Sequence, residues 1–78
     1  MRVRIEKTFV TTASGTRVVE TQPESFEVEA QSLADAVVEF IQNDGGRLLG
    51  TPTEKENRVV ATAWKNRVYL VCAEPAPD

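Results

Sequence analysis

The feature that most constrains this chain is one short amphipathic helix. Ser32 and Asp35 form a capping-box-like start, with Asp at the position where Glu or Gln is commoner. Apolar residues then recur on one helical face at Leu33, Ala36, Val37, Phe40 and Ile41. Gly45-Gly46 ends the helix, because glycine tolerates the left-handed backbone of a C-terminal cap. A helix of about eleven residues is not stable alone, so it must pack on another element.

Strand patterns precede this helix. Alternating apolar and polar residues predict a strand over Arg2–Thr12, and the composition of 13–16 predicts a turn in which Gly15 takes a positive φ. A second strand is expected over Arg17–Ala30. Pro23 interrupts it and cannot donate to a sheet ladder, so this strand is bent or lies at a sheet edge.

Three further strands are expected after the helix. They are Arg47–Thr51, Arg58–Trp64 and Arg67–Ala73, with Pro52 and a polar loop over 53–57 closing the first of them. Lys65-Asn66 is interpreted as the two-residue loop of a hairpin that joins the last two strands.

These elements predict a two-layer α+β sandwich of order ββαβββ. A single helix can cover only one face of the mostly antiparallel, five-stranded sheet. In 78 residues there is room for one domain, which we place at 1–74, followed by a flexible C-terminal tail over 75–78.

The two-residue loop pairs Trp64 with Arg67 and thereby assigns the hairpin residues to two faces. The small Ala61 and Ala63 would let the helix approach closely, so their face is placed beneath it. The predicted helix-side set is Val59, Ala61, Ala63, Val68, Leu70 and Cys72. The predicted uncovered set is Val60, Thr62, Trp64, Arg67, Tyr69 and Val71.

The uncovered face is the main candidate binding surface. Trp64 and Tyr69 are the only Trp and the only Tyr of the chain, and Arg58 and Arg67 are placed beside them. Aromatic residues and arginine are enriched at the energetic centres of protein interfaces. We therefore expect these four residues to contact a partner. The alternatives are that the same face closes a homodimer, or that arginine stems and the tail shield it.

The acidic segment is the second candidate. No Lys or Arg occurs from Val18 to Gly46, and Asp35 and Glu39 lie one turn apart on the outer helix face. Such a surface can attract a basic partner. The simpler interpretation is a solvated helix face, with Asp35 favoured by the helix dipole.

Nucleic-acid binding is a rival interpretation. Bases would stack on the two aromatic residues, and Arg2, Arg4, Arg58 and Arg67 would contact phosphates. The net charge of −3 argues against nucleic acid as the main partner, and Glu27 and Glu29 are expected to pair with Arg2 and Arg4 across the strands.

Catalysis is not expected. The chain contains no histidine, so it has no Ser-His or Cys-His pair, and no metal or cofactor is predicted. Cys72 is interpreted as a small core residue. No apolar run approaches the ~20 residues of a membrane helix and no signal-peptide core is present, so we expect a cytoplasmic protein with no membrane partner.

The order of elements in a short acidic chain resembles that of small phage-encoded anti-CRISPR proteins. The stretch from Phe26 to Ala36 is similar to the segment in which a strand of such proteins leads into a capped helix. The resemblance implies stoichiometric occlusion of a nuclease-effector complex, with a protein or ribonucleoprotein as the partner. The most specific expectation is therefore a phage or mobile-element inhibitor of a host CRISPR-Cas or other defence complex.

Overall fold

The computed structural model describes residues 1–13, 16–19 and 23–77, with side chains described for 1–10 and 23–77. The predicted turn glycine, Gly15, lies outside the described residues. The elements are one helix and strands at both ends of it: β1 (Arg2–Ala13), β2 (Thr16–Val19), β3 (Glu24–Glu29), α1 (Leu33–Asn43), β4 (Arg47–Lys55), β5 (Arg58–Trp64) and β6 (Val68–Pro75).

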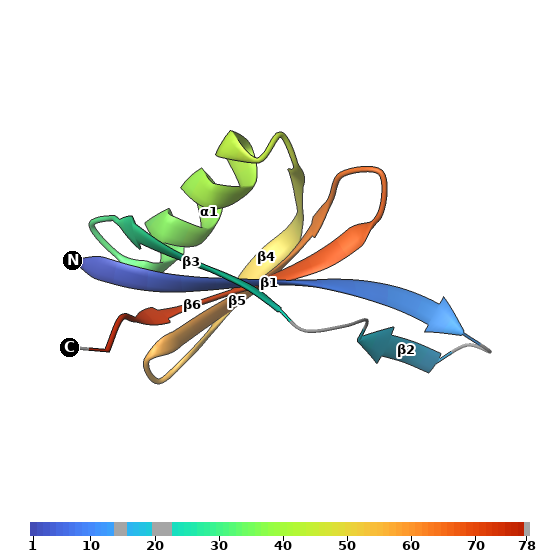
Figure 1. The fold of residues 1–78 in the computed structure, drawn as a ribbon, viewed down its shortest axis with the longest axis horizontal. Coiled ribbons are helices and arrows are strands. Elements are labelled where there is room, and N and C mark those ends of the chain that lie inside the picture. The colour runs from blue at the N-terminus through green and yellow to red at the C-terminus, as the bar shows by residue number, and fades with distance from the viewer. Residues whose placement is uncertain (14–15, 20–22, 78) are drawn as a thin grey trace.

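The strands form one antiparallel sheet in the order β2-β1-β6-β5-β4, and β3 also pairs with β1. The first and last strands therefore lie side by side in the middle, while the two strands that flank the helix in sequence, β3 and β4, lie at opposite edges. Figure 1 shows α1 above one side of the sheet and the β1–β2 hairpin projecting beyond it. The predicted two-layer α+β sandwich is confirmed.

The helix begins and ends where its sequence predicts. The Asp35 amide donates to Ser32 Oγ at 3.1 Å, which caps the first turn. At the other end Gly45 has a φ of 80°, and the Gly46 amide donates to the Ile41 carbonyl at 2.9 Å. The chain can therefore turn directly from α1 into β4.

The core lies between α1 and one face of the sheet. The helix contributes Ala36, Val37 and Ile41, each at most 1% exposed. The sheet contributes Val3, Ile5, Val59, Ala61, Ala63, Tyr69, Val71 and Ala73. The prediction that Ala61 and Ala63 lie beneath the helix is confirmed, and their small side chains leave room for Tyr69 beside them.

Two strands differ from their predicted bounds. The strand expected over Arg17–Ala30 is described as two strands, β2 and β3, and counting them as one interrupted strand restores the predicted order. β4 continues to Lys55 through the segment expected to be a loop, because two extra residues are accommodated between Leu49 and Thr53. Gly50, at φ 70°, supplies the required backbone conformation there.

The predicted tail is shorter in the structure. β6 extends to Pro75, whose register partner is Val3, and the Ala76 amide donates to the Arg2 carbonyl at 3.1 Å. Pro75 thus belongs to the sheet, and Ala76 is held to it by one backbone hydrogen bond to Arg2. Asp78 lies outside the described residues.

The predicted register of the last hairpin is wrong by one residue. Trp64 pairs with Val68, and Ala63 pairs with Tyr69, so the connection is the three residues 65–67. Asn66 takes the left-handed conformation in this connection, with a φ of 67°. Since the side-chain period of a strand is two, this shift exchanges the two faces of β6. Tyr69 and Val71 lie beneath the helix, and Val68, Leu70 and Cys72 lie on the opposite side.

Candidate binding surfaces

The sheet surface opposite α1 is the first candidate, and we call it the open face. Its centre consists of Leu49, Val60, Thr62, Trp64, Val68, Leu70 and Cys72, which the register of β4, β5 and β6 places on one side. Within the described residues no helix or strand lies over this surface (Figure 1). The open face is therefore a largely apolar sheet surface without a covering layer, a feature that on small domains marks a contact surface.

Trp64 is the most exposed large hydrophobic residue of the open face. Its side chain is 45% exposed, which confirms that it faces away from the core. Val68 lies opposite it on β6 and Arg47 on β4. The Arg47 guanidinium is 6.0 Å from the centroid of the indole, close enough for a cation–π interaction. Arg47 was not among the predicted contact residues, because its neighbour across the sheet is not evident from sequence.

Tyr69 is not part of the open face, and the prediction that it faces outward is wrong. It is fully buried, and its ring packs edge-on against Phe9 with the centroids 6.2 Å apart. The Tyr69 hydroxyl lies directly over Gly46, where any Cβ would overlap it. Residues from Val68 to Ala73 are all apolar, so their pattern is equally compatible with either register.

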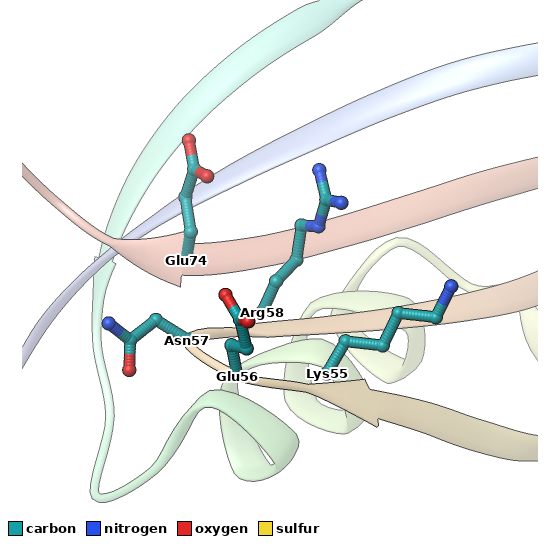
Figure 2. Close-up of a pocket in the computed structure, with 5 residues that line it drawn as sticks. All are labelled: Lys55, Glu56, Asn57, Arg58 and Glu74. Carbon is teal, nitrogen blue, oxygen red and sulfur yellow. The ribbon is translucent and has the colours of Figure 1, made fainter.

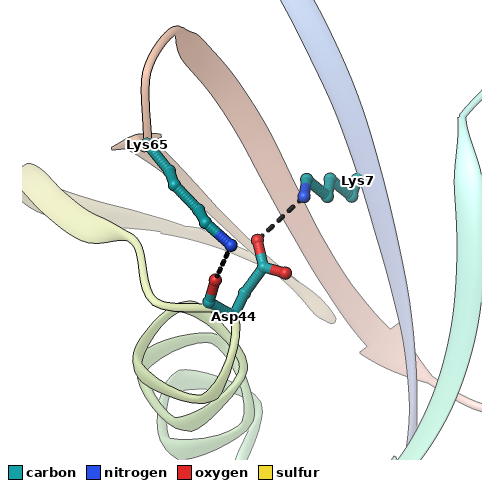
Figure 3. Close-up of polar contacts among 3 residues, drawn as sticks. All are labelled: Lys7, Asp44 and Lys65. Atoms are coloured by element: carbon teal, nitrogen blue, oxygen red, sulfur yellow. Dashed lines mark hydrogen bonds and ion pairs between the residues drawn. The ribbon is translucent and has the colours of Figure 1, made fainter.

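A partly buried cation, Lys7, links this end of the core to the helix. Lys7 Nζ lies 4.7 Å from the centroid of the Tyr69 ring and donates to the Asp44 carboxylate at 2.8 Å (Figure 3). Lys65 donates to the Asp44 backbone carbonyl, so that the end of α1 is tied to β1 and to the last hairpin. The hydrogen bond from Lys7 holds the pKa of Asp44 below its ordinary value, although partial burial acts in the opposite direction.

The Tyr69 hydroxyl has no hydrogen-bond partner at standard geometry. Burial raises the pKa of Tyr69, and the nearby negative charge of Asp44 raises it further. The phenol is therefore a neutral, buried core group near Asp44, and it is not accessible to a binding partner.

The two predicted arginines lie far from each other. Arg67 lies in the connection between β5 and β6, with its guanidinium 4.6 Å from the centroid of the Phe9 ring on the helix side of the sheet. Arg58 begins β5, so it lies about 20 Å along that strand from Trp64 at ~3.3 Å per residue. The four predicted contact residues, Trp64, Tyr69, Arg58 and Arg67, do not form one site.

Arg58 instead lines a shallow polar depression of ≈ 590 Å³ at the turn between β4 and β5. Its other lining residues are Lys55, Glu56, Asn57 and Glu74. In Figure 2 the Arg58 and Glu74 side chains extend to the same side of their neighbouring strands. Cations and carboxylates are mixed here, and in the part of the chain that the structure describes no three Cys, Asp or Glu side chains gather as metal ligands.

Cys72 lies on the open face, which corrects its predicted place beneath the helix. Burial by its neighbours raises the pKa of its thiol; Arg58 opposes this, and Glu74 and Glu6 add to it. The side chain is half-buried, and its raised pKa keeps the thiol protonated at neutral pH, which disfavours a role as a nucleophile.

The acidic helix face is the second predicted surface. Asp35 and Glu39 are both exposed on α1, as expected. Glu39 also borders a groove between α1 and β3 that the sequence did not reveal. Phe26, whose ring lies 5.1 Å from that of the groove residue Phe40, is 39% exposed, although the alternation of β3 indicated that it would be buried.

Comparisons with protein families, with curated proteins and with solved structures found no significant match to this chain. Among the described residues, no helix has the length and apolar character needed to cross a membrane.

Proposed function

We propose that this protein is a non-catalytic binding protein whose open face covers a surface of a protein or ribonucleoprotein complex. The observation that carries the proposal is Trp64, half-exposed beside Arg47 on an apolar sheet surface without a covering layer. A rigid aromatic ring with an arginine beside it is the combination most enriched among residues that dominate binding energy.

The edges of the sheet also favour binding through a face. β4 carries an irregularity between Leu49 and Thr53, a left-handed Gly50 and Pro52. β3, at the other edge, is short and bears Glu24, Glu27 and Glu29. Irregular or charged edge strands resist the addition of a further strand, so partner contact through the open face is the more accessible mode.

The most specific form of the proposal is an inhibitor, carried by a phage or mobile element, of a host CRISPR-Cas or other defence complex in the host cytoplasm. The element order and the capped strand-to-helix segment from Phe26 to Ala36 support it by resemblance. Occlusion needs no catalytic group, only a rigid surface of suitable shape, which the open face offers.

The test is cleavage of target DNA by purified CRISPR-Cas effector complexes with increasing amounts of the protein. Inhibition should reach its limit near one equivalent of the protein. Trp64→Ala and Arg47→Ala should weaken it, whereas Gln42→Ala, an exposed change on α1, should not. Absence of inhibition in every effector type tested would remove this specific form of the proposal.

Nucleic-acid binding receives less support from the geometry. Arg2 and Arg4 lie opposite Glu29 and Glu27 in the strand register, as expected. The ion pairs are different from those expected, since Arg4 pairs with Glu6 at 2.9 Å and with Glu74 at 3.9 Å, and Glu29 pairs with the N-terminal ammonium at 3.6 Å. The arginines of the rival interpretation are thus partly neutralised or, like Arg67, on the other side of the sheet. Affinity for oligonucleotides that falls steeply with salt and is lost in Arg58→Ala would favour this alternative.

A homodimer through the open face is the remaining alternative. Sedimentation velocity of the wild type and Trp64→Ala separates it from the proposal. A dimer that becomes monomeric on this substitution would show that a second copy occupies the open face.

A further inference from the structure

A second apolar surface lies on the helix side of the sheet, in the groove between α1 and β3. It is lined by Val28, Glu29, Ala36, Glu39, Phe40 and Asn43, and it encloses ≈ 290 Å³. This is below the ~300–1,000 Å³ usual for small-molecule sites, so it suits one or two protein side chains better than a cofactor.

The groove exists because α1 covers only part of the sheet. The helix packs on β6, β5, β4 and β1, whereas β3 is the outermost strand on the other side of β1. Phe26 and Phe40 approach across the gap with their ring centroids 5.1 Å apart, but Phe26 remains 39% exposed. Phe40 thus lines a space that the fold leaves open, and Phe26 packs beside Phe40.

The rim of this groove is acidic. Glu39 lines it and Asp35 lies one helical turn before Glu39, whereas Glu29, which also lines it, is paired with the N-terminal ammonium at 3.6 Å. Among the described side chains no lysine or arginine forms an ion pair with Glu39 or Asp35. Lys7, the cation that β1 presents on this side, is already paired with Asp44.

From this combination we infer that the groove binds a cationic segment of a partner protein. One large apolar side chain of that segment enters beside Phe40, and flanking lysines or arginines face Glu39 and Asp35. The charge of the rim selects a basic segment, since an acidic one would meet like charges. This surface lies on the opposite side of the sheet from Trp64, so the inference does not depend on the proposed function of the open face.

The test is an NMR titration of the ¹⁵N-labelled protein with a synthetic peptide that has one leucine flanked on each side by lysine and arginine. Amide shifts are expected at Val28, Ala36 and Phe40 and not at Trp64. A peptide with serine in place of the leucine should bind about tenfold more weakly, because the buried apolar contact is lost. No shifts around the groove at millimolar peptide would overturn the inference.

Two substitutions that change the net charge by the same amount distinguish binding at the groove from a general electrostatic attraction of the peptide to the protein. Glu39→Lys on the rim should weaken peptide binding by about tenfold or more, and Glu54→Lys on β4 by less than about twofold. Equal weakening by both would show attraction by net charge alone and overturn the inference. Phe26→Ala should also weaken binding, whereas Trp64→Ala should leave it unchanged.

Sedimentation of the protein without peptide tests whether a second copy of the protein occupies the groove. Concentration-dependent self-association that Glu39→Lys abolishes would show that a second copy occupies the groove, and this would also overturn the inference. A monomer that binds the peptide at the groove supports it, whatever the outcome of the effector assays on the open face.

Discussion

At the scale of single residues, the two unique aromatic side chains of this protein have opposite environments. Trp64 is 45% exposed and Tyr69 is fully buried, although only four residues separate them. Their substitutions should therefore affect different properties. Trp64 contributes to a surface, and Tyr69 contributes to the packing between α1 and the sheet.

The first prediction compares Trp64→Ala with Tyr69→Ala in urea unfolding. Trp64→Ala should lower the free energy of unfolding by about 1 kcal/mol or less, because the indole keeps much of its contact with water. Tyr69→Ala should lower it by about 3–5 kcal/mol, as expected for a large residue removed from a core. Equal losses in the two variants would contradict the register of the last hairpin.

The second prediction concerns the Tyr69 hydroxyl and Gly46. Tyr69→Phe should leave the stability unchanged or raise it by about 1 kcal/mol, since it removes a buried hydroxyl without a partner. Gly46→Ala should lower it by about 1–3 kcal/mol, because its Cβ would overlap that hydroxyl.

A double-mutant cycle supplies the control for the second prediction. Gly46→Ala should cost less in the Tyr69→Phe background, because the overlapping oxygen is absent. A clear loss of stability in Tyr69→Phe alone would instead show that the hydroxyl donates a hydrogen bond to Asp44.

At the scale of elements, the link between Lys7 and Asp44 attaches the end of α1 to β1. The pKa of Asp44 is lowered below 3.8 in the folded protein, mainly by the hydrogen bond from Lys7. A carboxylate with a lowered pKa stabilises the fold above its unfolded pKa, and this contribution is lost as the pH falls through the folded value.

The third prediction concerns how the stability changes with pH because of this lowered pKa. Urea melts of the wild type should show stability falling as the pH drops below about 4, and Asp44→Asn should show a shallower fall over that range. Asp44→Asn should also be less stable at neutral pH, because it leaves the Lys7 ammonium, 12% exposed, without its charged partner. If the free energy of unfolding fell equally with pH in the wild type and in Asp44→Asn, the proposed stabilisation by the Asp44 carboxylate would be contradicted.

The fourth prediction concerns the connection that sets the β5–β6 register. Asn66 has a φ of 67°, a conformation that costs roughly 1–2 kcal/mol for residues other than Gly, Asn and Asp. Asn66→Gly should therefore be tolerated, and Asn66→Val should lower the stability by about 1 kcal/mol or more. Thermal melts monitored by circular dichroism measure both, and an Asn66→Val variant as stable as the wild type would contradict the left-handed conformation of Asn66.

At the scale of the whole molecule, the two sides of the sheet offer different chemistry. The open face presents Trp64 beside Arg47 on an apolar surface, whereas the side with α1 presents the acidic groove at Phe26 and Phe40. A partner that binds one side leaves the other accessible, so the two can be tested separately.

The fifth prediction uses Trp64 as the single fluorophore of its kind in the chain. In the free protein its emission should be red-shifted and quenched by acrylamide, because the indole is 45% exposed. Binding of a partner to the open face should shift the emission to the blue and reduce quenching. Binding of the basic peptide to the groove should change neither, and a blue shift with that peptide would place it on the wrong side.

Local signals in the sequence were sufficient for the helix and the fold class. Ser32, Asp35 and Gly45 specify the helix ends through hydrogen bonds to nearby backbone, and the apolar spacing between them specifies its buried face. The alternation up to Trp64 was sufficient to place Ala61 and Ala63 inward and Trp64 outward. These properties depend on neighbours within a few residues, which a sequence displays directly.

The register of β6, the strand order and the groove were decided only by the tertiary structure. Both faces of β6 are apolar, so burial of Tyr69 in place of Leu70 depends on a left-handed Asn66 and on the space above Gly46. Likewise, Val28 and Phe40 line a groove because β3 lies at the edge of the sheet, outside the strands on which α1 mainly packs. Contacts between segments that are distant in sequence depend on how the whole core packs. Local sequence patterns therefore do not predict them.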